Sequence, residues 1–129
     1  MILLTLLAAA AQPQTIDCDN AVSQMAMTEC ARRGFTAADA VLNAEYKKAM
    51  AAMRKLDAEP GSHPSGDTRP GYAAALTEAQ RAWIAYRDAH CRSAGYQMRG
   101  GSAEPMLVWG CKETLTRDRT EQLIDLRKN

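Results

Sequence analysis

The chain lacks most of the features that identify a function directly. Its 129 residues include one Phe, two Trp and four Tyr, so a hydrophobic core must be built mainly from Ala, Leu, Met and Val. Sixteen basic and fifteen acidic residues leave a formal net charge of +1, which excludes the basic surface of a typical nucleic-acid-binding protein. No apolar run reaches the roughly 20 residues that a transmembrane helix requires. The length fits a single domain.

Familiar catalytic motifs are also absent. The sequence has no nucleophile elbow, no H-E-x-x-H pair and no phosphate-binding glycine loop. Glu78 and Asp88 lie on one predicted helix, but ten positions separate them, which is about 15 Å along a helix axis. That separation is too large for paired acid and base catalysis on one bond. We therefore expect a protein that is not an enzyme and that needs no cofactor.

The first residues have the composition of an export signal. Residues 2–11 are apolar apart from Thr5, and Ala9 to Ala11 offer a small-residue cleavage site before Gln12. No positively charged residue precedes this run, and a buried N-terminal helix is the alternative. The residues before Cys18 do not fit a lipid-modified cysteine. We predict a signal peptide at residues 1–11, a mature domain at 12–129 and a periplasmic or secreted location.

Four cysteines in a short exported chain indicate two disulfides. Three pairings are possible, and the local one, Cys18–Cys30 with Cys91–Cys111, is favoured because each bond closes a short loop. In the loop-entropy description each bond stabilises the fold by about 3 kcal/mol. Zinc is the alternative, but no C-x-x-C pair is present, so we expect no metal site.

A dense helical pattern covers Leu76–Cys91, which contains no Gly or Pro over sixteen residues. Its apolar residues recur at helical spacing. This stripe consists of Leu76, Ala79, Trp83, Tyr86 and His90. The spacing predicts that Trp83 and Tyr86 are core aromatics and that Asp88 pairs with Arg92 on the surface.

Three further helices are predicted, one before and one after Gly34 and one near the C-terminus. The first covers about residues 20–33 and ends at Gly34, and the second follows a Thr36 cap and continues to about residue 57. The last covers about residues 103–127, after a Ser102 cap. The second helix carries a seam with heptad-like spacing, formed by Leu42, Tyr46, Ala49, Met53 and Leu56. This seam is expected to pack lengthwise against the Trp83 helix.

The fold class that follows is all-α, a small four-helix bundle with two disulfides. Residues 59–71 contain three prolines and three glycines, which rule out a helix. We expect this segment to be a flexible loop, because long connections without secondary structure are either disordered or functional.

The sequence resembles the LprI-type lysozyme inhibitor family, whose members are small exported helical domains. The resemblance is carried by the segments 24–31, 38–46 and 76–91 and extends through Cys111 toward the C-terminus. Its signature residues here are Leu42, Tyr46, Gln80, Arg81, Trp83, Tyr86, Arg87 and Asp88. Thr28 stands where the family usually has Asn. The resemblance implies an exported helical domain that binds a protein.

The segment after the Trp83 helix is the candidate binding site. A Cys91–Cys111 bond would frame this short polar segment and reduce the cost of ordering it on binding. Tyr and Arg are residue types that dominate interface energetics. The candidate residues are Tyr96, Arg99, Gly100, Gly101, Ser102 and Glu104. The alternative is a plain turn between helices.

Three functional hypotheses remain at this point. The first is an envelope protein that binds lysozyme, or another cell-wall protein, through the framed turn. The second is a periplasmic structural or accessory domain without inhibitory activity. The third is a small-molecule or metal carrier that uses the methionines and His63, although the methionines fit core positions better. The near-neutral charge does not favour strong electrostatic steering toward a cationic lysozyme.

Overall fold

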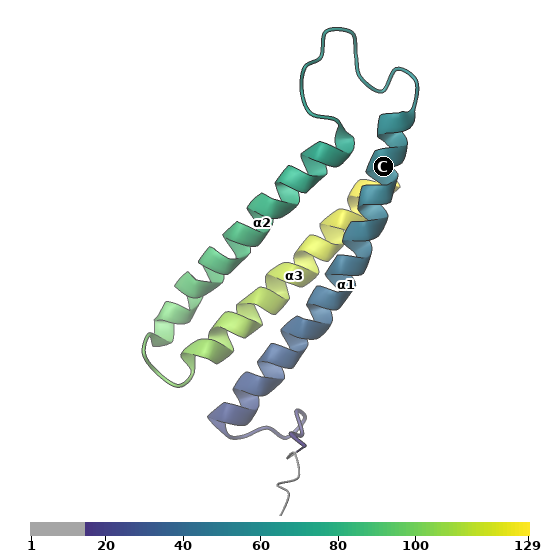
Figure 1. The fold of residues 1–129 in the computed structure, drawn as a ribbon. Coiled ribbons are helices and arrows are strands. Elements are labelled where there is room, and N and C mark those ends of the chain that lie inside the picture. Colours follow the sequence, from purple (N-terminus) through teal and green to yellow (C-terminus); the bar gives the residue numbers. More distant parts are fainter. Residues whose placement is uncertain (1–14) are drawn as a thin grey trace, which may run out of the picture.

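The structure is a computed structural model that describes residues 15–129. It contains three long helices, α1 (Gln24–Ala58), α2 (Tyr72–Gly95) and α3 (Glu104–Lys128), and a short 3-10 helix, η1 (Tyr96–Met98). The chain runs up, down and up again, so that α1 and α3 are parallel and α2 is antiparallel to both (Figure 1). Residues 15–129 contain no strand. The all-α prediction is confirmed, whereas the prediction of four helices is wrong.

The missing helix boundary is at Gly34, which lies inside α1. A glycine in a helix interior costs only about 1 kcal/mol relative to Ala, and here the Glu113 side chain of α3 lies beside it. A side chain at this position would collide with the carboxylate of Glu113. Thr36, the predicted cap, instead donates its hydroxyl to the Arg32 carbonyl within the helix, at 3.0 Å. The packing of α1 on α3 therefore outweighs the local helix-stop signal.

Helix α1 packs more extensively on α3 than on α2. The two parallel helices are in contact along most of their length. At the start of both helices, Gln24 Nε2 lies 3.5 Å from Met106 Sδ. At the end of α3, Arg127 Nε donates to Glu45 Oε2 of α1 at 3.1 Å. The predicted pairing of the α1 seam with α2 is thus the smaller of the two α1 contacts.

The hydrophobic core joins all three helices. Its buried members are Leu42, Ala49, Met50, Met53, Leu76 and Leu123, and Tyr46 and Trp83 are among the partly buried residues packed against them. The predicted α1 seam is confirmed except at Leu56, which is exposed near the end of the helix.

Helix α2 is rotated relative to the prediction from its apolar stripe. The side chains of Gln80 and Arg87 are buried, whereas Tyr86 is 55% exposed and stacks on His90, with ring centroids 5.3 Å apart. Polar side chains can be buried when they find partners, and Gln80 Oε1 accepts a hydrogen bond from Arg119 Nε at 3.0 Å. The prediction that Tyr86 is a core aromatic is wrong.

Arg87 is a buried cation held between two aromatic rings. Its guanidinium carbon lies 5.1 Å from the ring centroid of Phe35 on α1 and 5.1 Å from that of Trp83 on α2. Phe35 in turn packs against Trp109 of α3, with centroids 5.4 Å apart. Aromatic faces within about 6 Å stabilise a cation that has lost water, so the rings of all three helices contribute to one cluster.

Polar groups complete the surroundings of Arg87. Its Nε donates to Asp88 Oδ1 at 3.0 Å, and its Nη1 lies 3.5 Å from both Asp39 Oδ1 and Thr116 Oγ1. Lys112 Nζ is 3.4 Å from the same Asp88 oxygen. The predicted surface pair of Asp88 with Arg92 is therefore replaced by contacts with the core arginine and with α3.

We expect Arg87→Ala to lower the free energy of unfolding by about 2 to 3 kcal/mol, because it removes a buried cation and leaves its polar neighbours without their partner. The value lies below that of a fully buried pair because Asp39 and Asp88 are partly exposed. Urea unfolding measures the change. Arg81→Ala, at an exposed position of the same helix, should change stability by less than about 0.5 kcal/mol. Equal effects of the two variants would contradict the structural role of Arg87.

Candidate functional site

Two disulfides lie at the same end of the bundle, and both have the pairing that the sequence predicted. Cys91–Cys111 links the end of α2 to the start of α3 with Cα atoms 5.4 Å apart, and Cys18–Cys30 ties the N-terminal lead to α1 with Cα atoms 5.6 Å apart. The turn between α2 and α3 lies at this end, and the loop 59–71 lies at the other (Figure 1). We call the disulfide-linked region, residues 15–32 and 91–111, the stapled end.

The turn between α2 and α3 has a defined backbone. Gly101 N–H donates to the Met98 carbonyl at 2.8 Å, and Gly100 has a φ of +78°, which favours glycine. Gly100 N–H donates to a Glu104 carboxylate oxygen at 2.7 Å. Ser102, the predicted cap, is not the N-cap of α3, and the Glu104 bond stabilises the turn instead. Three of the predicted site residues thus fix the shape of the turn.

Tyr96 and Arg99 form the exposed part of the same turn. The Arg99 guanidinium carbon lies 4.4 Å from the centroid of the Tyr96 ring, and Tyr96 remains 43% exposed. Within residues 15–129 no carboxylate forms an ion pair with Arg99. The arrangement presents a guanidinium group that is oriented by an aromatic ring and is free to bind an acidic group.

The start of α1 extends this surface, which the sequence did not reveal. Met25 is 74% exposed and Val22 is 89% exposed. Met25 and Ser102 line one shallow groove of about 550 Å³ between α1 and the turn. Met25 and Met98 are thus surface residues, although the sequence favoured core positions for the methionines. For Met98, its position in a glycine-containing turn was a sequence signal of exposure. For Met25, the sequence offered no such signal.

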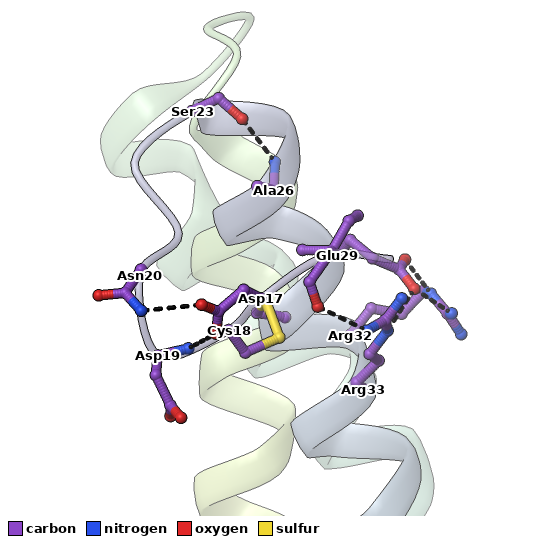
Figure 2. The surroundings of a disulfide bond; sticks show 11 residues. Asp17, Cys18, Asp19, Asn20, Ser23, Ala26, Glu29, Arg32 and Arg33 are labelled. Carbon is purple, nitrogen blue, oxygen red and sulfur yellow. Dashed lines mark hydrogen bonds and ion pairs between the residues drawn. A yellow bond between two sulfur atoms is a disulfide. The ribbon is translucent and has the colours of Figure 1, made fainter. Parts of the chain in front are cut away.

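The N-terminal lead is held to α1 by more than its disulfide (Figure 2). Ser23 caps α1 by accepting the Ala26 N–H at 3.1 Å. Arg33 reaches the Ile16 carbonyl at 3.4 Å. These contacts place residues 16–23 beside the first turns of α1.

Glu29 is the centre of a small ionic cluster at the stapled end. It lies 2.7 Å from Arg32 and 2.9 Å from Arg33 (Figure 2). The hydrogen bonds from Arg32, and then from Arg33, lower the pKa of Glu29 to about 2. The carboxylate therefore stays charged over the whole physiological pH range and neutralises part of the charge of the two arginines.

The family signature residues occupy a different region from the candidate site. Leu42, Gln80 and Arg87 are buried and hold the helices together, whereas Arg81 and Tyr86 are exposed along α2. The buried signature residues therefore belong to the packing of the helices, and no signature residue lies in the turn that carries Tyr96 and Arg99.

The structure shows neither a metal cluster nor a membrane-spanning helix in its described part. No three His, Cys, Asp or Glu side chains within residues 15–129 are grouped as a metal site requires. None of the three helices is long and apolar enough to cross a bilayer. The described residues of the stapled end present the exposed ring of Tyr96 and the exposed guanidinium groups of Arg92 and Arg99, which form no ion pair within residues 15–129.

The fold and this surface define a small disulfide-bonded helical module. The profile of the family described as Lysozyme inhibitor LprI matches residues 18–123, and the chain belongs to this family. An uncharacterised protein of Rhizobium meliloti (strain 1021) is 49% identical over 123 residues, which cover 93% of this chain and 84% of the relative. No solved structure matches the chain.

The Glu29 cluster predicts a pH dependence of stability. The folded pKa of about 2 lies below the ordinary value of 4.5, so the charged carboxylate stabilises the fold above about pH 4.5. This contribution is lost as the pH falls toward 2. Thermal unfolding should show wild type above Glu29→Gln at neutral pH and a shrinking difference in acid. Asp118→Asn, at an exposed carboxylate without an ion pair in residues 15–129, is the control that should show no such convergence.

Proposed function

We propose that this protein is an exported inhibitor that binds a muramidase through the turn between α2 and α3. Membership of the lysozyme inhibitor family supports the class of partner. Two disulfides support folding in an oxidising compartment, which is where a muramidase acts on the cell wall. The predicted signal at residues 1–11 agrees with that location but lies outside the described residues.

The observation that carries the proposal is the oriented guanidinium of Arg99. Its position over the Tyr96 ring, 4.4 Å from the centroid, is built into a turn held by Cys91–Cys111 and by the Glu104 bond to Gly100. A preformed loop loses little conformational entropy on binding. Tyr and Arg side chains are also the residue types most often found at the energetic centre of interfaces.

The chemistry of a muramidase cleft complements this turn. Glycoside hydrolases hold two carboxyl groups beside the scissile bond. A guanidinium group can bind a carboxylate through two parallel hydrogen bonds. Arg99 would therefore bind a catalytic carboxylate of the muramidase and block access of the substrate to the cleft. Because the chain carries a formal net charge of only +1, affinity would come from this local contact and less from long-range attraction.

Inhibition is tested by adding excess purified protein to a muramidase that lyses a suspension of cell walls. We expect lysis to slow, and we expect Arg99→Ala and Tyr96→Ala each to raise the inhibition constant by roughly tenfold or more without lowering thermal stability. Arg81→Ala, an exposed arginine outside the turn, should leave inhibition unchanged.

The outcomes separate this proposal from the alternative of a periplasmic structural domain. Undiminished lysis with excess wild-type protein would favour that alternative. Replacing the cleft Glu of the muramidase by Gln should weaken its binding to the wild-type protein. The same replacement should leave its binding to the Arg99→Ala variant unchanged. If the two substitutions change the binding free energy additively, Arg99 does not contact that Glu.

A further inference from the structure

A hollow of the described surface lies at the end of the bundle opposite the two disulfides. Its volume is about 850 Å³, and it lies between the loop 59–71 and the outer side of α2. Such a volume is within the range of sites for small ligands. The residues that line it along α2 extend from Tyr72 to Ala82, a distance of about 15 Å along the helix. We call this hollow the loop groove.

The wall of the loop groove is held in place before any ligand binds. The Asp57 carboxylate accepts the backbone N–H groups of Tyr72 and Ala73 at 2.8 and 3.0 Å, and so caps α2 from the end of α1. The Ser62 hydroxyl donates to the Asp57 carbonyl at 3.1 Å. A Cβ at Gly71 would lie 2.6 Å from Asp57 Oδ1, so this capping contact depends on glycine. Both ends of the loop are thus anchored at one residue of α1.

The floor of the loop groove, which α2 forms, is mainly apolar. The floor consists of the methyl groups of Ala75, Ala79 and Ala82. The ring of Tyr72 is 44% exposed and contributes an aromatic side chain to the lining. Small floor residues leave space beside a flat ring, which suits a ligand with an apolar face.

Polar side chains line the loop side and the rim. Arg69 binds Asp67 through two N–H···O bonds, of 2.9 Å from Nε and 2.7 Å from Nη2, and their charges cancel. The His63 ring adds a further polar group to the lining, and its Nδ1 lies 3.1 Å from Ser62 Oγ. Glu78 adds a carboxylate.

These features select among classes of ligand. An extended peptide that binds by strand addition needs free backbone groups, and α2 offers none because its N–H and C=O groups bond within the helix. The cancelled charges of Asp67 and Arg69, beside the carboxylate of Glu78, do not attract a polyanion. A neutral sugar fits better, because it presents an apolar ring face to an aromatic side chain and hydroxyl groups to fixed planar donors and acceptors. We propose that the loop groove binds a short neutral oligosaccharide. This proposal is independent of muramidase inhibition.

The test is a titration of the full chain, labelled with ¹⁵N, with two neutral trisaccharides, tri-N-acetylchitotriose and maltotriose, at millimolar concentration. We expect at least one of them to shift the amide signals of the loop and of residues 72–82. We expect Tyr72→Ala to weaken that binding roughly tenfold. Ala79→Leu, which fills the floor with a residue of good helix propensity, should weaken it to a similar extent.

Matched positions on the same helix serve as controls. Tyr86→Ala removes another exposed tyrosine, and Ala85→Leu enlarges an exposed alanine. Neither position lines the loop groove. Both variants should bind like wild type. The proposal is overturned if neither trisaccharide shifts any signal, if the shifts occur at the stapled end, or if the control variants weaken binding as much as the groove variants. A proline-containing peptide that shifts the groove signals while the sugars do not would overturn it as well.

Discussion

The rest of the structure depends on the burial of Arg87. Removing a guanidinium from water is costly unless aromatic faces and hydrogen-bond partners replace the solvent, and here each helix supplies part of that replacement. Phe35 comes from α1, Trp83 from α2 and Thr116 from α3. The cluster therefore fixes the rotation of α2 about its own axis. Because neighbouring residues on a helix point about 100° apart, turning Arg87 inward turns Tyr86 outward.

That rotation has consequences at both ends of the bundle. It places Ala75, Ala79 and Ala82 on the outer side of α2, where the loop 59–71 can fold over them. It also directs Cys91 inward, where it bonds to Cys111 of the antiparallel helix α3. The two ends then differ in chemistry. One end carries the two disulfides and an exposed guanidinium on a turn, and the other carries an apolar floor with a polar rim.

The sequence predicted what depends on local pattern and failed where long-range packing decides. The class of fold and both disulfide pairings followed from composition and cysteine spacing. Gly34 was interpreted as a helix stop because glycine is poor inside helices, yet it lies inside α1, with the Glu113 carboxylate of α3 beside it. The candidate turn was identified from its framing cysteines, but Met25 could not be added to it, because only the fold places the start of α1 beside Ser102.

By itself, therefore, the sequence determined that the chain is helical, that its cysteines pair locally and that its turn between α2 and α3 is constrained, since each of these properties rests on residues close together along the chain. Only the tertiary structure decided which face of α2 is buried. Apolar periodicity favoured Leu76, Ala79, Trp83, Tyr86 and His90, but the buried face contains Gln80 and Arg87. The physical reason is that a polar side chain can be buried when its partners are present, and those partners lie on helices distant in sequence.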